Sequence, residues 1–152
     1  MSAQPITIMN TGLVTSVGLT APASCAAFRA KISNPTETRF IDSGGEWIMA
    51  HQVQLEQPWR GRTKLAKMAA MVIEECLDGI ERKQWSSIPL LLCVAERERP
   101  GRLDGLDDQL FLDIQDALDA RFAEQSAIVA HGRVGVAVAL GQARKLIYDG
   151  KV

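Results

Sequence analysis

Hydrophobic residues along this chain fall into two patterns: short unbroken runs, and segments in which they recur every three or four positions. Short apolar runs bounded by polar residues are typical of β-strands, whereas the three- and four-residue spacing is typical of amphipathic helices. These patterns predict strands at residues 6–9, 87–95 and 126–130, a strand or hairpin arm at 46–55, and helices at 20–33, 61–83, 107–122 and 134–148. Strands and helices therefore alternate along most of the chain.

Each predicted helix carries one apolar face, which we expect to point toward a core. Thr20 is placed to cap the first helix, and Pro22 is tolerated in its first turn. The expected inward residues are Ala26, Phe28 and Ile32, then Leu65, Met68, Ala69, Val72, Cys76 and Ile80, then Phe111, Ile114, Leu118 and Phe122, and finally Val136, Leu140 and Ile147. The last helix also contains many small residues, which predicts that it is buried between layers.

Alternating strands and helices predict an α/β fold, with a parallel or mixed sheet and helices on both of its faces. The nearly unbroken apolar run at 87–95 is typical of a strand that is covered on both sides. Gly12 and Gly18, after the first apolar run, indicate a loop that packs tightly. The chain shows no internal repeat and no linker, and it stops where a returning strand is expected. We therefore expect residues 1–152 to form a single, partial domain.

Composition and charge narrow the classes of function. The 152 residues are 47% hydrophobic and 23% charged, with a formal net charge of -1, as in ordinary soluble globular domains. The two signs of charge are interspersed, so no basic face for nucleic acid or an anionic membrane is expected. The apolar runs are much shorter than a membrane span, and no basic segment followed by an apolar one opens the chain. These observations predict a cytoplasmic protein.

The three cysteines give no sign of a disulfide framework or a zinc site. Cys25, Cys76 and Cys93 are odd in number, far apart and without a CxxC pair. We expect them to be buried free thiols. The acidic residues of the predicted helix at 107–122 lack the spacing of a metal-binding loop, so neither a metal nor a cofactor is expected.

The strongest candidate site is the sequence VAHGRVG, where the predicted strand at 126–130 meets the last helix. A sharp strand-to-helix turn presents unpaired N–H groups and a helix dipole, which favour an anion or a nucleophile. The turn carries His131, Gly132 and Arg133, but no Ser or Cys. His131 could be a general base or an anion contact, or its ring could be satisfied by backbone. Arg133 could hold a phosphate or carboxylate, or it could be solvated.

Two other polar segments are weaker candidates. Thr15 and Ser16 are hydroxyls in the first glycine loop, but no histidine and carboxylate accompany them at a recognisable spacing, so we expect loop hydroxyls. The charged loop at 96–102 could dock a partner or be a solvated connection.

Several motifs resemble the N-terminal half of a β-ketoacyl synthase, a member of the thiolase-like superfamily. ITIMNTGLVTSVG, residues 6–18, is similar to the family's first strand and glycine loop, although it lacks one glycine and has Thr15-Ser16 where Ser-Pro is common. CAAFRAKISNPTETRFID, residues 25–42, is similar to the following helix and its approach to the next strand. GQARKLIYDGKV, residues 141–152, resembles the later part of the family's nucleophile helix.

The resemblance implies a thiolase-like fold of which only the N-terminal half is present. It places Arg133 at, or within a residue of, the family's catalytic cysteine. A guanidinium cannot form an acyl thioester, because it stays protonated and is not nucleophilic. The family's two catalytic histidines belong to a C-terminal half that this sequence does not contain. The resemblance therefore implies a degenerate site at His131, Gly132 and Arg133, with no catalytic residue.

The resemblance also implies that the strand before the last helix pairs with a second subunit. The expected interface is Ser126, Ala127, Ile128, Val129 and Ala130, in a homodimer or in a heterodimer with another thiolase-like chain.

Three hypotheses for function follow. The favoured one is a non-catalytic, ketosynthase-like binding or assembly protein, in one version an accessory or chaperone-like adaptor linked to bacterial secretion. The alternative is the N-terminal part or a subunit of an active β-ketoacyl-ACP synthase in fatty acid or polyketide synthesis, with its nucleophile at Cys93 or outside this sequence. The third is an unrelated α/β binding domain. An acyl carrier protein or a secretion effector is the expected further partner.

Overall fold

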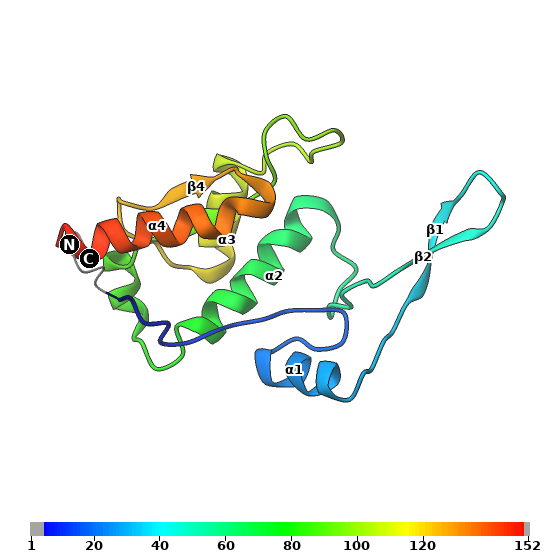
Figure 1. Ribbon diagram of the computed structural model, residues 1–152, viewed down its shortest axis with the longest axis horizontal. Helices are drawn as coiled ribbons and strands as arrows, with labels where there is room; N and C mark the ends of the chain where they lie inside the picture. Colours follow the sequence, from blue (N-terminus) through cyan, green and yellow to red (C-terminus); the bar gives the residue numbers. More distant parts are fainter. Residues whose placement is uncertain (1–4, 151–152) are drawn as a thin grey trace.

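The computed structural model describes residues 5–150 and shows a mixed α/β chain in that range (Figure 1). The helices are α1 (Ala21–Arg29), α2 (Gly61–Cys76), α3 (Asp108–Leu118) and α4 (Gly135–Tyr148), with short 3-10 helices η1 (Arg82–Ser87) and η2 (Gly132–Val134). The strands are β1 (Thr36–Ile41), β2 (Trp47–Ala50), β3 (Leu91–Cys93) and β4 (Ala127–Val129). Only 12% of these residues are in strands, against 40% in helices, so helices and loops form most of the body.

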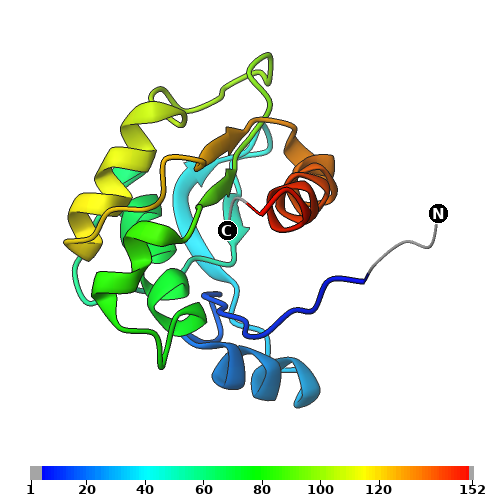
Figure 2. The same cartoon turned by 90° about the vertical axis from the view of Figure 1, so that its left-hand side faces the viewer.

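The central feature is a parallel pair of strands with helices on both faces (Figure 2). Leu91 lies opposite Ala127 and Cys93 opposite Val129, so β3 and β4 run in the same direction. Helices α2 and α3 lie on one side of this pair, and α4 lies on the other (Figure 2). The predicted parallel pairing and two-sided helix arrangement are confirmed. The sheet is smaller than expected, with two strands among the described residues, and the thiolase-like strand order stays a prediction.

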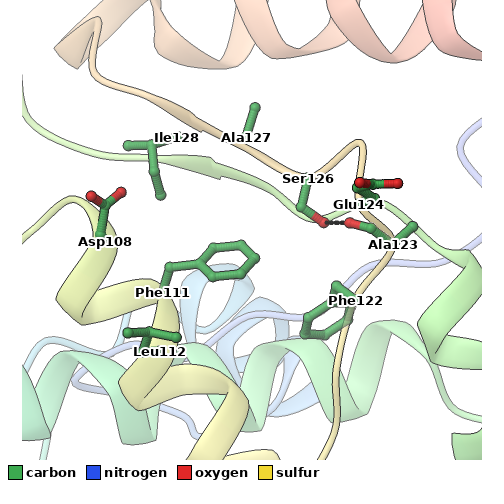
Figure 3. A pocket seen from close by; sticks show the side chains of 9 residues that line it. All are labelled: Asp108, Phe111, Leu112, Phe122, Ala123, Glu124, Ser126, Ala127 and Ile128. Carbon is green, nitrogen blue, oxygen red and sulfur yellow. Dashed lines mark hydrogen bonds between the residues drawn. The ribbon is translucent and has the colours of Figure 1, made fainter.

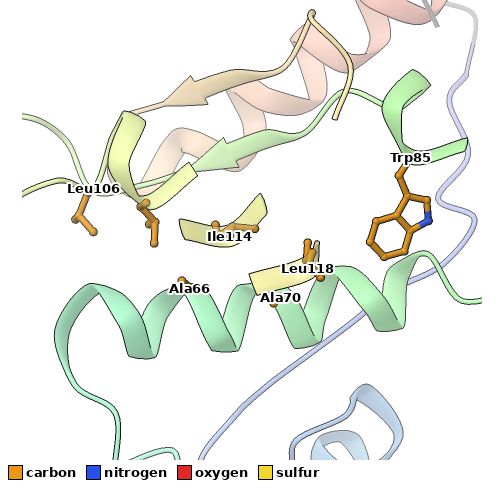
Figure 4. Packing of buried hydrophobic residues seen from close by; sticks show 7 residues of the cluster. Ala66, Ala70, Trp85, Leu106, Ile114 and Leu118 are labelled. Atoms are coloured by element: carbon orange, nitrogen blue, oxygen red, sulfur yellow. The ribbon is translucent and has the colours of Figure 1, made fainter. Parts of the chain in front are cut away.

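The hydrophobic core lies between α2, α3 and one face of β3 (Figure 4). Ala66 and Ala70 are buried on α2, and their small side chains let α3 approach closely. Ile114 and Leu118 of α3 are 0% and 1% exposed. Trp85 of η1 closes one end of the core, and its indole N–H donates to the carbonyl oxygen of Ile80 at 3.1 Å. This face of the sheet is therefore covered by two layers of side chains.

The N-terminal segment packs on α2 as an extended loop. The strand predicted at 6–9 is wrong: these residues have no regular secondary structure, and Ile8 and Met9 are 72% and 89% exposed. The close approach predicted at Gly12 is confirmed, because a Cβ there would collide with the backbone carbonyl oxygen of Val72. The Glu75 carboxylate accepts a hydrogen bond from the Leu13 N–H at 2.9 Å, which ties the loop to α2.

Helix α1 begins as the sequence predicts. Thr20 accepts a hydrogen bond from the Ala23 N–H at 3.3 Å, and Pro22 lies in the first turn. The helix ends at Arg29, earlier than the predicted residue 33, and Lys31 follows with a positive φ of 55°. The predicted inward residues Ala26, Phe28 and Ile32 are all exposed, Phe28 and Ile32 at 53% and 57%, and Ser24 and Ala27 are buried instead, so the predicted inward face is wrong.

Strands β1 and β2 form a hairpin that projects away from the helices (Figure 1). They pair antiparallel, with Thr36 opposite Ala50 and Ile41 opposite Trp47. The prediction of a hairpin arm around 46–55 is confirmed for its first half. Large apolar side chains of the hairpin are exposed, including Phe40 and Met49. The hairpin is a separate two-stranded sheet that projects from the helices, so no packed layer covers these side chains, which accounts for their exposure (Figure 1).

Two predicted helix ends lie beyond the observed ones. Helix α2 ends at Cys76, and the chain turns at Gly79, whose φ of 84° is not helical. Helix α3 ends at Leu118 because Asp119 takes the left-handed conformation, with φ 46°. The periodic apolar residues continue past both ends, so periodicity alone predicts helices that are too long.

The last helix differs most from its prediction. We expected α4 to be buried between layers with Val136, Leu140 and Ile147 inward, but these residues are 63%, 45% and 48% exposed. Gly135 is the one residue of α4 that is buried. Beyond Gly135, the half-buried residues of α4 are Val138, Ala139, Ala143 and Leu146, so the helix lies on the sheet with a different face from the predicted one and leaves the predicted face uncovered.

The cysteines are also more accessible than expected. Cys25 and Cys93 are exposed and Cys76 is half-buried, so the prediction of buried thiols is wrong for the first two. All three are free thiols. Within residues 5–150, none of the helices has the length and apolar character needed to cross a membrane.

Candidate functional site

The turn between β4 and α4 lies at the carboxyl ends of β3 and β4. The Val94 N–H donates to the carbonyl oxygen of Val129 at 3.0 Å, and the Gly132 N–H donates to the carbonyl oxygen of Val94 at 3.2 Å. These bonds extend the β3–β4 pairing into the turn and fix where η2 starts. Gly132 has a φ of 50°, which glycine adopts at little cost and which reverses the chain into the helix.

The carboxylate of Glu96 lies directly over Gly132. A Cβ on Gly132 would collide with Glu96 Oε2, the end of a flexible exposed side chain, so a substitution here would displace Glu96 as well as strain the positive φ. Glu96 belongs to the charged loop that follows β3, whereas Gly132 follows β4. Because β3 and β4 are parallel, both loops emerge at the same edge of the sheet. The parallel pairing therefore brings the two candidate segments of the sequence together.

The two loops line a hollow of about 450 Å³. Its lining residues are Glu96, Arg99, His131, Arg133 and Val134. All five are exposed, and among residues 5–150 no ion pair joins either arginine to a carboxylate. The hollow thus holds two guanidinium groups, one imidazole and one carboxylate, which suits a polar or anionic group better than an apolar one.

Of the predicted turn residues, His131 and Arg133 line the hollow, and Gly132 lies beneath Glu96; that they form a functional site stays a prediction. Glu96 and Arg99 come from the charged loop at 96–102, whose position beside this turn was not predicted. The signal was present in the sequence: the charged loop at 96–102 follows an apolar run that pairs in parallel with 126–130. Loops after neighbouring parallel strands converge on one edge.

No activated thiol lies in this site. Cys93 is the cysteine that lies beside the start of α4. It is the last residue of β3, and a Cβ built on Gly135 of α4 would lie 3.5 Å from the Cys93 Cβ. Cys93 is exposed as a residue, but the side that lies toward Gly135 is partly desolvated, and this partial burial raises the pKa of its thiol above the ordinary value. A nucleophilic cysteine needs the opposite shift. Cys93 therefore lacks the electrostatic environment of a catalytic thiolate.

Cys76 is likewise unsuited to nucleophilic chemistry. Burial is the largest cause that raises the pKa of its thiol, and the neighbouring Glu75 charge adds to it, against a smaller lowering by a hydrogen bond from the Gly12 backbone. Glu75 itself anchors the N-terminal segment, because its carboxylate also accepts from the Ala21 N–H at 2.8 Å. Glu75 and Cys76 therefore help to hold the N-terminal segment on α2.

Of the two hydroxyls predicted in the first glycine loop, that of Thr15 has structural partners. Thr15 Oγ1 lies 3.0 Å from Ser24 Oγ and accepts a hydrogen bond from the Val17 N–H at 3.3 Å. Ser24 is fully buried and donates to the carbonyl oxygen of Gly18 at 3.0 Å. These contacts agree with the prediction of loop hydroxyls.

Strand β4, which lies within the predicted dimer interface, has one edge paired with β3 and one edge without a strand beside it among residues 5–150. The Ala127 N–H donates to the carbonyl oxygen of Leu90, and the Val129 carbonyl accepts from Val94, so the backbone groups of both residues face β3. In a parallel ladder alternate residues face opposite sides, so the backbone groups of Ile128 point away from β3. A pairing partner at Ser126–Ala130 would therefore meet Ile128, and the interface stays a prediction.

No group of three or more potential metal ligands gathers anywhere in residues 5–150. Comparison with known proteins found no match: no protein-family model, no curated protein and no solved structure resembles the chain.

Proposed function

We propose that this chain is a non-catalytic, ketosynthase-like binding or assembly module. The observation that carries the proposal is the chemistry of the turn before α4. His131, Gly132 and Arg133 occupy the turn, and Glu96 covers Gly132, so the site offers charge and hydrogen bonds but no nucleophile. The resemblance to ketosynthases supplies the family in which such a turn would otherwise carry a catalytic cysteine.

The state of Cys93 also supports a binding role. A catalytic replacement for the missing cysteine would need a thiol that ionises easily near α4. Cys93 lies against Gly135 at the start of α4, but its pKa is raised by burial. The alternative of an active β-ketoacyl-ACP synthase subunit then requires a nucleophile supplied from outside these residues.

The uncovered face of α4 supports an assembly role. Apolar side chains at Val136, Leu140 and Ile147 are about half exposed or more. An exposed apolar surface of this kind is typical of protein contacts. A second thiolase-like chain, in a homodimer or heterodimer, is the partner that the resemblance favours, and a secretion-linked adaptor is the second version of the same proposal.

Acylation of the protein tests the absence of catalysis. The purified chain is incubated at pH 7 with a cysteine-directed acyl-enzyme probe and examined by intact mass spectrometry. The test uses a Cys25→Ser, Cys76→Ser background, because Cys25 is an exposed thiol outside the site. We expect no saturable adduct at Cys93, because partial burial disfavours its thiolate. Arg133→Cys is the matched control, since it places a thiol in the exposed turn and should be labelled. Saturable labelling of the native chain that Cys93→Ser abolishes would overturn the proposal.

Affinity capture of the full-length protein from its own cell extract then distinguishes the two versions. Recovery of an acyl carrier protein, or of a ketosynthase that retains its cysteine, would indicate a subunit of acyl-chain assembly. Recovery of a secretion or effector protein without a carrier protein would indicate an adaptor. If neither kind of partner is recovered, and the native and Arg133→Ala baits capture the same background proteins, both versions of the proposal are contradicted.

A further inference from the structure

A second cavity, of about 460 Å³, lies between α3 and β4, on the face of the sheet opposite α4 (Figure 3). Its walls are apolar: Phe111 and Leu112 come from α3, Phe122 from the following loop and Ile128 from β4. The ring of Phe122 stacks on Trp85 with ring centroids 6.1 Å apart, so this wall is held in place from behind. The cavity is therefore a preformed apolar groove.

Two carboxylates lie on opposite sides of this groove. Figure 3 shows Asp108 at one side of the two phenyl rings and Glu124 at the other. No residue that lines the groove carries a positive charge. Among residues 5–150, neither carboxylate forms an ion pair, although three other acidic residues of the same region do: Asp107 with Arg102, Asp113 with Arg62, and Asp116 with Arg121. The groove thus combines an apolar floor with two carboxylates that have no ion-pair partner among residues 5–150, of which Asp108 lies in the first turn of α3.

The groove is open along the free edge of the sheet. Ile128 lines it with its side chain, and the backbone N–H and carbonyl groups of Ile128 point away from β3. The other polar group of the lining is already satisfied, because Ser126 Oγ accepts from the Leu90 N–H at 2.9 Å and donates to the carbonyl oxygen of Ala123 at 2.6 Å. An extended chain laid here would find unpaired backbone groups beside an apolar pocket.

We propose that this groove docks an extended segment of a partner protein in which apolar residues lie between two basic residues. The apolar side chain enters between Phe111 and Phe122, and the flanking lysine or arginine side chains reach Asp108 and Glu124. A second copy of this chain fits poorly, because its own free edge brings the same two carboxylates and would set like charges against each other. This proposal and the homodimer version of the interface predicted at Ser126–Ala130 therefore exclude each other, because both use the edge at Ile128. The inference is independent of whether the turn at Arg133 is catalytically silent.

The test measures binding of two labelled peptides by fluorescence anisotropy at low salt, acetyl-Lys-Val-Leu-Val-Lys-amide and its acidic counterpart with glutamate in place of lysine. We expect only the basic peptide to bind. Asp108→Asn with Glu124→Gln should weaken that binding about fivefold, the size of two exposed ion pairs. Leu112→Arg, at a half-exposed position, should abolish binding by placing a cation in the groove. Circular dichroism confirms that each variant folds.

A matched charge control separates the groove from general attraction. Asp78→Asn with Glu98→Gln changes the net charge by the same amount at two exposed residues outside the groove, and should leave binding unchanged. Equal binding of both peptides, an equal loss in the control variant, or no binding at millimolar peptide would each overturn the proposal. A dimer of the native chain in sedimentation would also overturn it, if Leu112→Arg dissociates that dimer and the basic peptide does not. The groove would then hold a second copy of the chain.

Discussion

Helices α3 and α4 lie on opposite faces of the same two strands, and both have apolar residues at helical spacing, yet they are buried to very different extents. The α3 residues Leu110, Ile114 and Leu118 are 5%, 0% and 1% exposed. The α4 residues Val136, Leu140 and Ile147 are 63%, 45% and 48% exposed. The apolar pattern of a helix therefore predicts which face is suited to burial, but it does not predict that the face is buried.

The difference comes from what lies beyond each helix. Helix α2 packs against α3, and the alanines at Ala66 and Ala70 let the two helices approach closely. Helix α4 has the sheet beneath it but, among the described residues, no second layer above it (Figure 2). A helix whose outer side faces solvent keeps its apolar side chains exposed whatever its sequence. The contrast leaves the outer face of α4 available to a partner, whereas α3 offers only the edge around Phe111 and Leu112 that lines the groove beside β4.

The largest expected effect comes from breaking the sheet that both helices share. Val129→Pro removes an N–H on the side that faces β3, in a residue that is 1% exposed, and should destabilise the fold by about 3 kcal/mol or more. Urea denaturation followed by circular dichroism measures the loss.

Ile128→Pro is the matched control at the neighbouring position, because its N–H points away from β3. It should be tolerated far better than Val129→Pro. A predicted dimer through Ser126–Ala130 would dissociate in Ile128→Pro, which sedimentation detects. If the two prolines destabilise the chain equally, the assignment of inner and outer edges is wrong.

The second prediction compares the helices directly. Ile114→Ala leaves a cavity in a fully buried site and should lower the free energy of unfolding by about 3 kcal/mol. Leu140→Ala removes a half-exposed side chain from α4 and should cost less than about 1 kcal/mol, partly because alanine favours the helix. Equal losses in urea denaturation would mean that α4 is as well covered as α3, for example in an oligomer.

Periodicity and apolar runs were sufficient to predict the helices, the parallel strands β3 and β4 and the capped start of α1, because each depends on local sequence. The strand at 6–9 failed because a strand needs a neighbouring backbone, which its own residues do not specify. At the site, the turn residues 131–133 were predictable from glycine and the strand-to-helix change. Glu96 was missed because its position over Gly132 depends on the pairing of two distant strands.

The third prediction concerns the contact between α4 and the sheet. Gly135 is buried, and a Cβ there would lie 3.5 Å from the Cys93 Cβ and 3.6 Å from the carbonyl oxygen of Val129. These are ordinary contact distances, so Gly135→Ala should fit and gain up to about 1 kcal/mol from helix propensity. Gly135→Leu would overfill the contact and should cost about 2 kcal/mol. The unfolding temperatures of both variants test these two expectations. If Gly135→Leu leaves the unfolding temperature unchanged, the first turn of α4 is not held against β3.

The smallest expected effect is on the Cys93 thiol, which reports whether α4 stays in place. Burial against α4 raises the pKa of Cys93, so the folded chain favours the protonated thiol. The stability that this provides is fully present below the ordinary pKa of a thiol, and it is lost as the pH rises through the raised value.

In a Cys25→Ser, Cys76→Ser background, alkylation of Cys93 by iodoacetamide at pH 8 should therefore be severalfold slower in the folded chain than in urea. Its rate should continue to rise at a pH where the rate for the unfolded chain has levelled off. Gly135→Leu, which pushes α4 away from β3, should bring the folded rate toward the unfolded one. Equal rates in the folded and unfolded native chain would show that α4 does not shield this thiol, and that the first turn of the helix is as open as the rest of its outer face.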